Sequence, residues 1–185
     1  ITIGEAACDP IIRKALAIGA DDAIRVNAAP EDSMQVAQLI AEQAQAGAFD
    51  AILCGKETID HNGSVVPAMV AELLDLPFVA LATSLEVENG IAKMTREVGG
   101  GEESVEVALP FVASASKGMA EQRIPNMRGI MSARSKPLNV VEASADAPTS
   151  VSKFTLPPEK GACKMIDADR PEELIRLLRE EAKAI

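Results

Sequence analysis

The chain has 185 residues and a formal net charge of −10, from 18 basic and 28 acidic side chains. This balance argues against general binding to nucleic acid or to an anionic membrane surface. Hydrophobic residues make up 48% of the chain, with four Phe and no Trp or Tyr, so we expect an aliphatic core. No apolar run approaches the roughly 20 residues that cross a bilayer, so membrane insertion is not expected.

Histidine and cysteine are too sparse for the usual catalytic or metal sites. The only histidine is His61, and Cys8, Cys54 and Cys163 lie far apart without metal-binding spacing. We therefore expect reduced cysteines in a cytoplasmic protein, no metal site and no catalytic residues. His61 lies in a predicted loop, where a solvated or ligand-adjacent role is favoured over catalysis.

In chain order, strands and helices alternate through the first half of the chain. Strands are expected at residues 1–4, 23–26, 49–54 and 77–82, with helices over 9–19, 31–45 and 65–74. Asp9 and Ser64 are predicted N-caps, and Pro10 and Pro67 fall in first turns. The alternation predicts an α/β fold with a Rossmann-like parallel sheet covered by helices on both faces. Because residues 1–4 have the pattern of a strand end, we expect a further N-terminal segment in the whole protein.

The second half predicts an antiparallel extension and an arm. Residues 84–87 and 91–98 flank a Glu-Asn-Gly turn, which indicates a hairpin, and the alternation at 104–112 predicts a third antiparallel strand. A last strand is expected at 138–142. Residues 143–158 are typical of a linker, and a capping box at Asp169 predicts a helix to residue 185. We therefore expect one domain over 1–142, and a linker and helix over 143–185 that could contact a partner.

The polar loop at residues 55–64 follows a predicted strand and precedes a predicted helix, the usual place for a nucleotide in a parallel sheet. Gly55 allows close approach of a ligand, and Asp60 could accept a ribose hydroxyl or brace the loop. A phosphate could bind at the helix start, near Asn62, Gly63 and Ser64, with Lys56 adding charge. No Walker A or G-x-G-x-x-G string occurs, so an ordinary strand–helix connection capped by Ser64 stays open.

Two further segments each allow two interpretations. Residues 117–136 contain five basic side chains and one acidic one, interspersed with Ile124, Met127, Ile130 and Met131. Exposed apolar side chains ringed by arginine would form an adaptable docking surface, whereas buried ones would be core. Glu97 precedes three glycines and could meet an arginine across an interface or simply lead into a turn.

Four motifs, in this order, resemble the β subunits of electron transfer flavoproteins: AIGAD at 17–21, LCGKETID at 53–60, REVGGG at 96–101 and IPNMRGIMSAR at 124–134. The resemblance spans nearly the whole chain. It implies a sheet of the adenine nucleotide alpha hydrolase type, preceded in family members by a further strand and helix. It also implies an electron carrier subunit rather than an enzyme.

The resemblance further implies a heterodimer with an α subunit, which holds most contacts to a redox FAD. The β subunit would bind AMP or, in electron-bifurcating members, a second FAD. The implied nucleotide contacts are Ile3, Gly55, Lys56, Asp60, Asn62, Gly63, Ser64, Val65 and Val66. Residues 60–67 depart from the family's D-D-D-C-N-Q-T-G, which favours contacts through the backbone.

The family's docking loop for acyl-CoA dehydrogenase-type flavoproteins matches residues 115–136. The implied docking residues are Arg123, Met127, Arg128, Ile130, Met131 and Arg134, with Met127 as the anchor. Glu97 matches a glutamate that faces an α-subunit arginine, and the C-terminal helix is expected to clasp that subunit. A bacterial-type cytoplasmic location is expected.

Two other classes compete with this one. A stand-alone nucleotide-binding regulator of the universal-stress-protein type would need no partner, but the long linker and helix look suited to wrapping another chain. A hydrolase on the same kind of sheet would need a nucleophile and base, which the sequence does not offer.

Overall fold

The computed structural model describes all 185 residues and divides into two compact units, Ile1–Val151 and Ser152–Ile185. The first unit contains eight strands: β1 (Thr2–Ile3), β2 (Ala23–Asn27), β3 (Ala51–Gly55), β4 (Phe78–Glu88), β5 (Ile91–Val98), β6 (Gly101–Ala108), β7 (Phe111–Ala115) and β8 (Leu138–Glu142). Its helices are α1 (Asp9–Ile18), α2 (Ser33–Gly47), α3 (Val66–Leu74) and α4 (Met127–Ala133), with a 3-10 turn at Ala6–Cys8. The second unit contains α5 (Pro171–Glu180).

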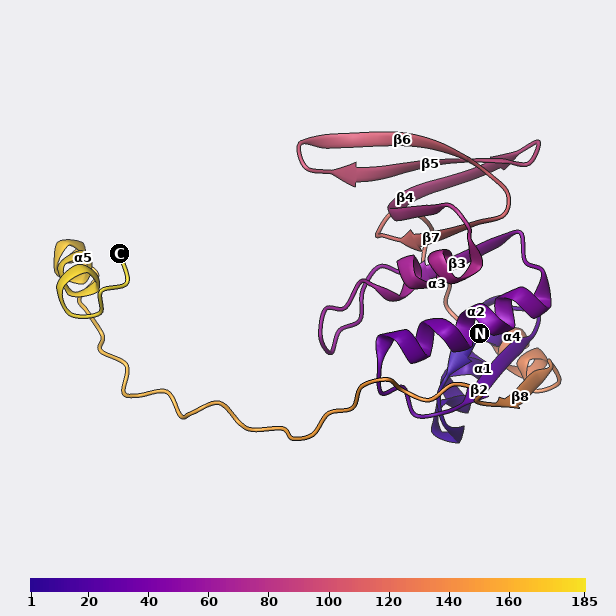
Figure 1. Cartoon of the computed structure of the whole chain (residues 1–185). Coiled ribbons are helices and arrows are strands. Elements are labelled where there is room, and N and C mark those ends of the chain that lie inside the picture. Colours follow the sequence, from indigo (N-terminus) through magenta and orange to yellow (C-terminus); the bar gives the residue numbers. More distant parts are fainter. The chain divides into compact units, whose positions relative to one another are not determined.

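The strands of the first unit form a parallel sheet and a mixed sheet (Figure 1). The parallel sheet has the order β1-β2-β8. The mixed sheet has the order β3-β7-β4-β5-β6, in which β3, β7 and β4 are parallel and β4, β5 and β6 are antiparallel. The expected α/β class and its antiparallel extension are therefore confirmed, although the parallel strands divide between two hydrogen-bonded sheets.

The prediction of one antiparallel strand over residues 104–112 is wrong. The chain turns at Leu109–Pro110, so that β6 ends before it and β7 begins after it. Pro110 has no N–H to donate, which makes it a poor residue for a strand interior. β7 runs between β3 and β4, where Phe111, Val112 and Ala113 are fully buried. The sequence pattern missed that this short segment is the central parallel strand.

The segments predicted as separate strands at 77–82 and 84–87 are one strand, β4. Its pairing with β7 shifts register between Val79 and Ala82, and Leu81 there has φ of 59°. A leucine rarely adopts this left-handed conformation. Ser114, from β7, holds it by accepting the Leu81 amide hydrogen at 2.8 Å. After this irregularity β4 leaves its parallel partner and pairs with β5.

Two predicted helix caps are also wrong. Asp9 is the first residue of α1, and its carboxylate pairs with the Arg25 guanidinium at 2.8 Å instead of capping the helix. α3 begins one residue later than expected, with Val65 at its N-cap and no side-chain cap. A side-chain cap is formed at α2, where Asp32 accepts from the amides of Met34 and Gln35.

Three groups of buried side chains hold the first unit together. One lies under the antiparallel strands around Met94 and Phe111, and a second joins α2 and α3 to β7 around Val70 and Val112. The third packs Ile12 and Leu16 of α1 against Ala133 of α4. α2 contacts both α3 and β1, and so connects the two sheets.

In the second unit, α5 has Glu172 and Glu173 in its first turn and Arg179 in its last, as its dipole favours. The N-cap is Arg170 without a side-chain bond, so the predicted capping box at Asp169 is not formed. The helix ends at Glu180 instead of residue 185. Its apolar stripe lines a hollow of about 250 Å³ together with Ile166.

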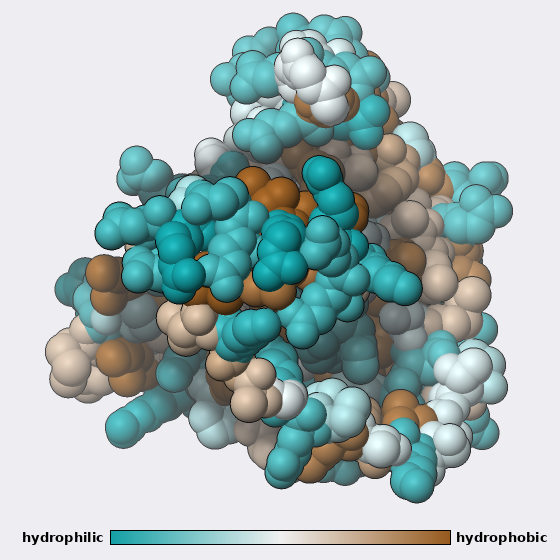
Figure 2. Space-filling model, turned by 90° about the vertical axis from the view of Figure 1, so that its left-hand side faces the viewer, coloured by the Kyte–Doolittle hydropathy of each residue, from teal (hydrophilic) through white to brown (hydrophobic).

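Figure 2 shows a face on which hydrophilic side chains predominate and apolar patches lie between them. None of the helices combines the length and the apolar composition that a bilayer crossing requires.

Candidate functional site

The carboxyl ends of β3 and β7 lie level with the point at which β4 leaves its parallel pairing. Gly55 of β3 pairs with Ala115 of β7, and Ala115 pairs in turn with Ala82 of β4. The loop at residues 56–65 leaves the sheet at this row and leads into α3. This edge of a parallel sheet is where ligands of such folds bind.

The loop is held by hydrogen bonds among its own residues. The Thr58 amide donates to the Gly63 carbonyl at 2.9 Å, and the Gly63 amide donates back to the Thr58 hydroxyl at 3.2 Å. The His61 amide donates to the Asp60 carboxylate at 2.7 Å, and Asn62 lies at φ of 51°. Every residue of the loop from Lys56 to Asn62 is exposed. The loop is thus shaped locally and covered by nothing in this unit.

Asp60 is the most perturbed charge in the loop. A hydrogen bond from the Thr58 side chain, followed by one from the His61 amide, lowers the pKa of its carboxyl below the ordinary value of 3.8. The carboxylate is therefore ionised at neutral pH and can accept a ligand hydroxyl. It also braces the loop, so both roles suggested by the sequence are compatible with the geometry.

The start of α3 leaves backbone donors free. No side chain caps the helix, and Pro67 occupies its first turn. The unpaired N–H groups and the helix dipole together favour an anion at this end. A methyl group placed on Gly55 would meet no atom within 4 Å, so the space in front of the strand end is open. Lys56, which could contribute charge, pairs with Glu57 at 3.1 Å.

The remaining predicted nucleotide contacts lie in different places. Ser64 and Val65 are exposed just before α3, and Val66 packs against the core beneath the helix. Ile3 lies in β1 and pairs with Val26 in the parallel sheet. Strand pairing therefore does not join Ile3 to the loop.

A nucleotide fits the chemistry of this edge mainly through the backbone. Uncapped amides at α3 suit a phosphate, open space at Gly55 admits a close approach, and the Asp60 carboxylate suits a hydroxyl. No cluster of three or more His, Cys, Asp or Glu side chains exists that could hold a metal ion.

The basic segment presents its apolar residues to solvent. Exposed fractions are 83% for Ile124, 73% for Met127, 68% for Met131 and 42% for Ile130. The interpretation of these side chains as core is therefore wrong. In α4, only Ala133 is buried. Asn126 caps the helix by accepting from the Gly129 amide at 2.8 Å.

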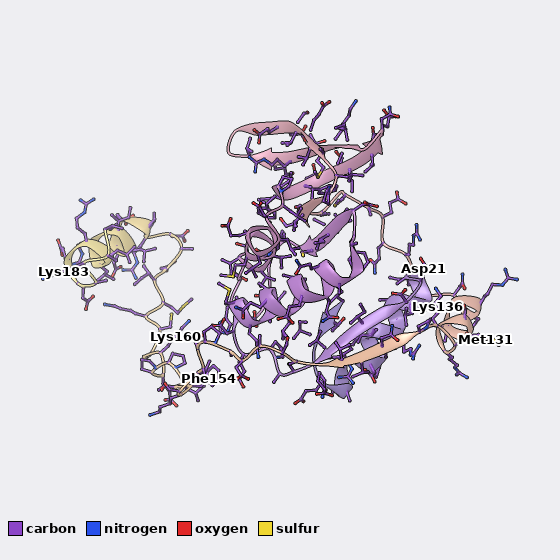
Figure 3. The ribbon with its side chains drawn as sticks, turned by 45° about the vertical axis from the view of Figure 1, so that its right-hand side comes forward. Asp21, Met131, Lys136, Phe154, Lys160 and Lys183 are labelled. Atoms are coloured by element: carbon purple, nitrogen blue, oxygen red, sulfur yellow. The ribbon has the colours of Figure 1, made fainter.

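Long-range hydrogen bonds fix α4 against α1. Arg13 of α1 donates to the carbonyls of Ala133 and Lys136 at 2.7 Å each, at the end of α4. Lys136 donates in return to the carbonyls of Leu16 and Ala20, at the end of α1. Figure 3 shows Lys136 near Asp21 and Met131 on the same part of the unit. Arg13 of α1 thus satisfies a carbonyl at the end of α4, and Lys136, which follows α4, satisfies a carbonyl in the last turn of α1.

A close contact between the two helices adds to these hydrogen bonds. Together, these contacts between α1 and α4 are called the brace below. Any Cβ at Gly129 would overlap the carbonyl oxygen of Ala17, so only glycine permits the observed approach of α4 to α1. The sequence analysis did not predict the brace, and it grouped Lys136 with the other basic side chains of residues 117–136. Arg123, Arg128 and Arg134 are exposed and have no carboxylate partner.

Glu97 lies exposed on β5, directly opposite Glu102 on β6. The neighbouring pair, Arg96 and Glu103, forms an ion pair at 2.5 Å. Glu97 has no basic partner within the chain, and a like charge opposite it is unfavourable. A cation from another molecule would relieve this arrangement.

Known proteins resemble this chain along nearly all of its length. The family model described as the electron transfer flavoprotein domain matches residues 1–146. The electron transfer flavoprotein subunit beta of Bacillus subtilis is 33% identical over 200 aligned residues, covering 100% of this chain and 78% of the relative. The protein of the same name from Syntrophomonas wolfei is 40% identical over 176 residues, covering 93% and 69%. The human one is 30% identical over 190 residues, covering 97% and 74%.

Proposed function

Because the chain belongs to the electron transfer flavoprotein family, among relatives named as subunit beta, we propose that it pairs with an α subunit and carries electrons from flavoprotein dehydrogenases. The observation that carries the proposal is α4, a short helix fixed against α1 that exposes three apolar side chains, Met127, Ile130 and Met131, among unpaired arginines. That combination is typical of a protein interface and untypical of a free surface.

The chain's own part is to hold a nucleotide and to dock a partner. FAD, held mainly by the α subunit, supplies the redox chemistry when bound. AMP would lie at the strand row of Gly55, with its phosphate at the uncapped start of α3 and Asp60 as an acceptor for a ribose hydroxyl. A second FAD in the same place is the alternative, and its adenylate half would make the same contacts.

Docking would begin with Met127, the most exposed methionine of α4. Its unbranched side chain can enter a partner pocket of irregular shape. Arg123, Arg128 and Arg134 would steer a partner of opposite charge and make the association rate fall with salt. The apolar anchor would supply most of the affinity, because buried anchors dominate interfaces of this kind.

The α subunit would meet two other features. Glu97 lacks a basic partner and can take an arginine from that subunit. In residues 143–185, α5 carries the narrow apolar stripe of Leu174, Leu177 and Leu178, which suits a clasp on another chain. Residues 1–142 would hold the nucleotide and the docking surface. A cytoplasmic location stays a prediction.

Co-expression with the α subunit encoded in the same genome tests the proposal. We expect a heterodimer that retains nucleotide through purification, with the released nucleotides separated by chromatography. One FAD and one AMP per heterodimer would support the typical class, and two FAD would support the bifurcating alternative. A chain that purifies alone, with neither partner nor flavin, would contradict the proposal.

The docking assignment has its own test in Met127→Ala. Truncation removes the anchor, so we expect slower electron transfer from an acyl-CoA dehydrogenase of the same organism, with flavin content unchanged. Met127→Leu is the matched control, because it keeps the apolar volume, and should transfer electrons nearly as well as the wild type. Equal kinetics for the alanine variant and the wild type would remove Met127 from the docking surface.

A further inference from the structure

A groove of about 610 Å³ lies between α1 and α4. One face of α1 lines it with Pro10, Arg13, Lys14 and Ala17, which are spaced i, i+3, i+4 and i+7. Ile130 of α4 and Arg134, the C-cap of that helix, line the other side.

The groove combines an apolar floor with a cationic rim. Ala17 and Ile130 contribute to the floor, and Arg13, Lys14 and Arg134 stand around it. None of these three cations forms an ion pair with a carboxylate of the chain. The guanidinium of Arg13 donates to backbone carbonyls, which leaves its positive charge uncompensated. In a chain of net charge −10, such a rim is a local exception.

The groove is continuous with the exposed face of α4. Ile130 belongs to both, since it lines the groove and is 42% exposed. Met131, next to it, is also exposed and lies on the same part of the unit as Lys136, the residue that ties α4 to α1 (Figure 3). A partner that covers α4 would therefore also meet the groove, and a small ligand in the groove would leave the methionines in water.

We propose that this groove receives an apolar side chain, flanked by carboxylates, from the dehydrogenase that docks on α4. The inference rests on the proposed function and adds α1 to the docking surface. Met127 projects toward the partner, while the groove admits a group from the partner, so that the two surfaces interlock in both directions. The uncompensated charges of Lys14 and Arg134 select a segment that is acidic as well as apolar.

Three variants of the heterodimer test the proposal, with the KM of an acyl-CoA dehydrogenase for it as the readout over a range of salt concentrations. Lys14→Ala removes one rim charge, and we expect KM to rise roughly fivefold at low salt and to converge with the wild type at high salt. Ala17→Leu fills the floor, and we expect a rise of about tenfold at every salt concentration. Ala15→Glu is the control.

The control changes the net charge by the same single unit as Lys14→Ala, on the same helix. Ala15 is exposed but does not line the groove, so KM should change by less than about twofold. Thermal unfolding and flavin content of each heterodimer confirm that the variants fold and assemble. If the Ala17→Leu variant unfolds at a lower temperature than the wild type, the KM of the Lys14→Ala variant alone tests the proposal.

The failure of this inference is distinguishable from failure of the docking function. If Met127→Ala slows transfer while Lys14→Ala and Ala17→Leu leave KM unchanged, the groove proposal is overturned and the docking helix stands. If Met127→Ala, Lys14→Ala and Ala17→Leu all behave as the wild type, the groove proposal and the docking function are both overturned. Saturable binding of octanoate that Lys14→Ala abolishes, with KM unchanged, would assign the groove to a small anion and also overturn the proposal.

Discussion

The proposed docking segment and the proposed nucleotide loop are both exposed, yet they are held in opposite ways. α4 is tied to α1 by hydrogen bonds between residues about 120 positions apart in the chain, such as Arg13 to Ala133. The loop at 56–65 is tied only to itself, through Thr58, Asp60 and Gly63. A surface that must meet a protein in brief encounters benefits from being formed in advance. A loop that keeps its nucleotide can be completed by that nucleotide.

The sharpest way to break the brace is Gly129→Ala. In most helices this change stabilises by about 1 kcal/mol. Here the new Cβ would overlap the Ala17 carbonyl, so we expect destabilisation by about 2 kcal/mol, as measured by urea unfolding. Gly99→Ala, where a Cβ meets nothing, should stay within about 0.5 kcal/mol of the wild type. A more stable Gly129→Ala variant would contradict the close approach of the two helices.

Lys136→Met tests the brace from the other side. The variant keeps the aliphatic stem and removes the donor to the carbonyls of Leu16 and Ala20, which we expect to cost about 1 kcal/mol of unfolding free energy. Lys117→Met is the matched control, because Lys117 is exposed and has no partner. Equal losses in the two variants would mean that Lys136 acts only through its charge.

A substitution in the loop at residues 56–65 should affect ligand binding more than stability. Asp60→Asn removes the ionised acceptor, and we expect weaker nucleotide retention with little change in the urea unfolding of nucleotide-free protein, because the loop is tied to nothing else. Glu57→Gln changes an adjacent charge and serves as the control. Full nucleotide occupancy in the Asp60→Asn variant after purification would exclude Asp60 from the site.

A smaller, pH-dependent effect is expected at the N-cap of α2, outside both regions. A hydrogen bond from Thr149, ahead of those from Met34 and Gln35, lowers the pKa of Asp32 below its ordinary value of 3.8. Its stabilisation is therefore complete above that unfolded value and is lost as the pH falls through the lower folded value. Asp32→Asn should be less stable than the wild type at neutral pH, and the difference in Tm should shrink on acidification. A difference that does not change with pH would exclude the charge as its cause.

The sequence predicted where most helices and strands lie, but not the caps of α1, α3 and α5 or the contacts between distant segments. Periodicity located α1, α2 and α3, and the strand–loop–helix pattern located the candidate loop, since each depends on neighbouring residues. It could not place β7 between β3 and β4, because the pairing of Gly55 with Ala115 joins residues sixty positions apart. It also could not tell that Lys136 caps α1 or that Asp9 pairs with Arg25. Composition alone left Met127 as either core or surface.

Hydrogen exchange on the heterodimer, with its nucleotide removed and then with AMP restored, tests the central contrast most directly. We predict slow exchange of the α4 amides in both states, because the brace is complete without a ligand. The first-turn amides of α3 and those of Thr58 and Gly63 should exchange fast without AMP and become protected with it. Two results would contradict the account: protection of the α4 amides that appears only with AMP, or exchange rates of the Thr58 and Gly63 amides that do not change when AMP is added.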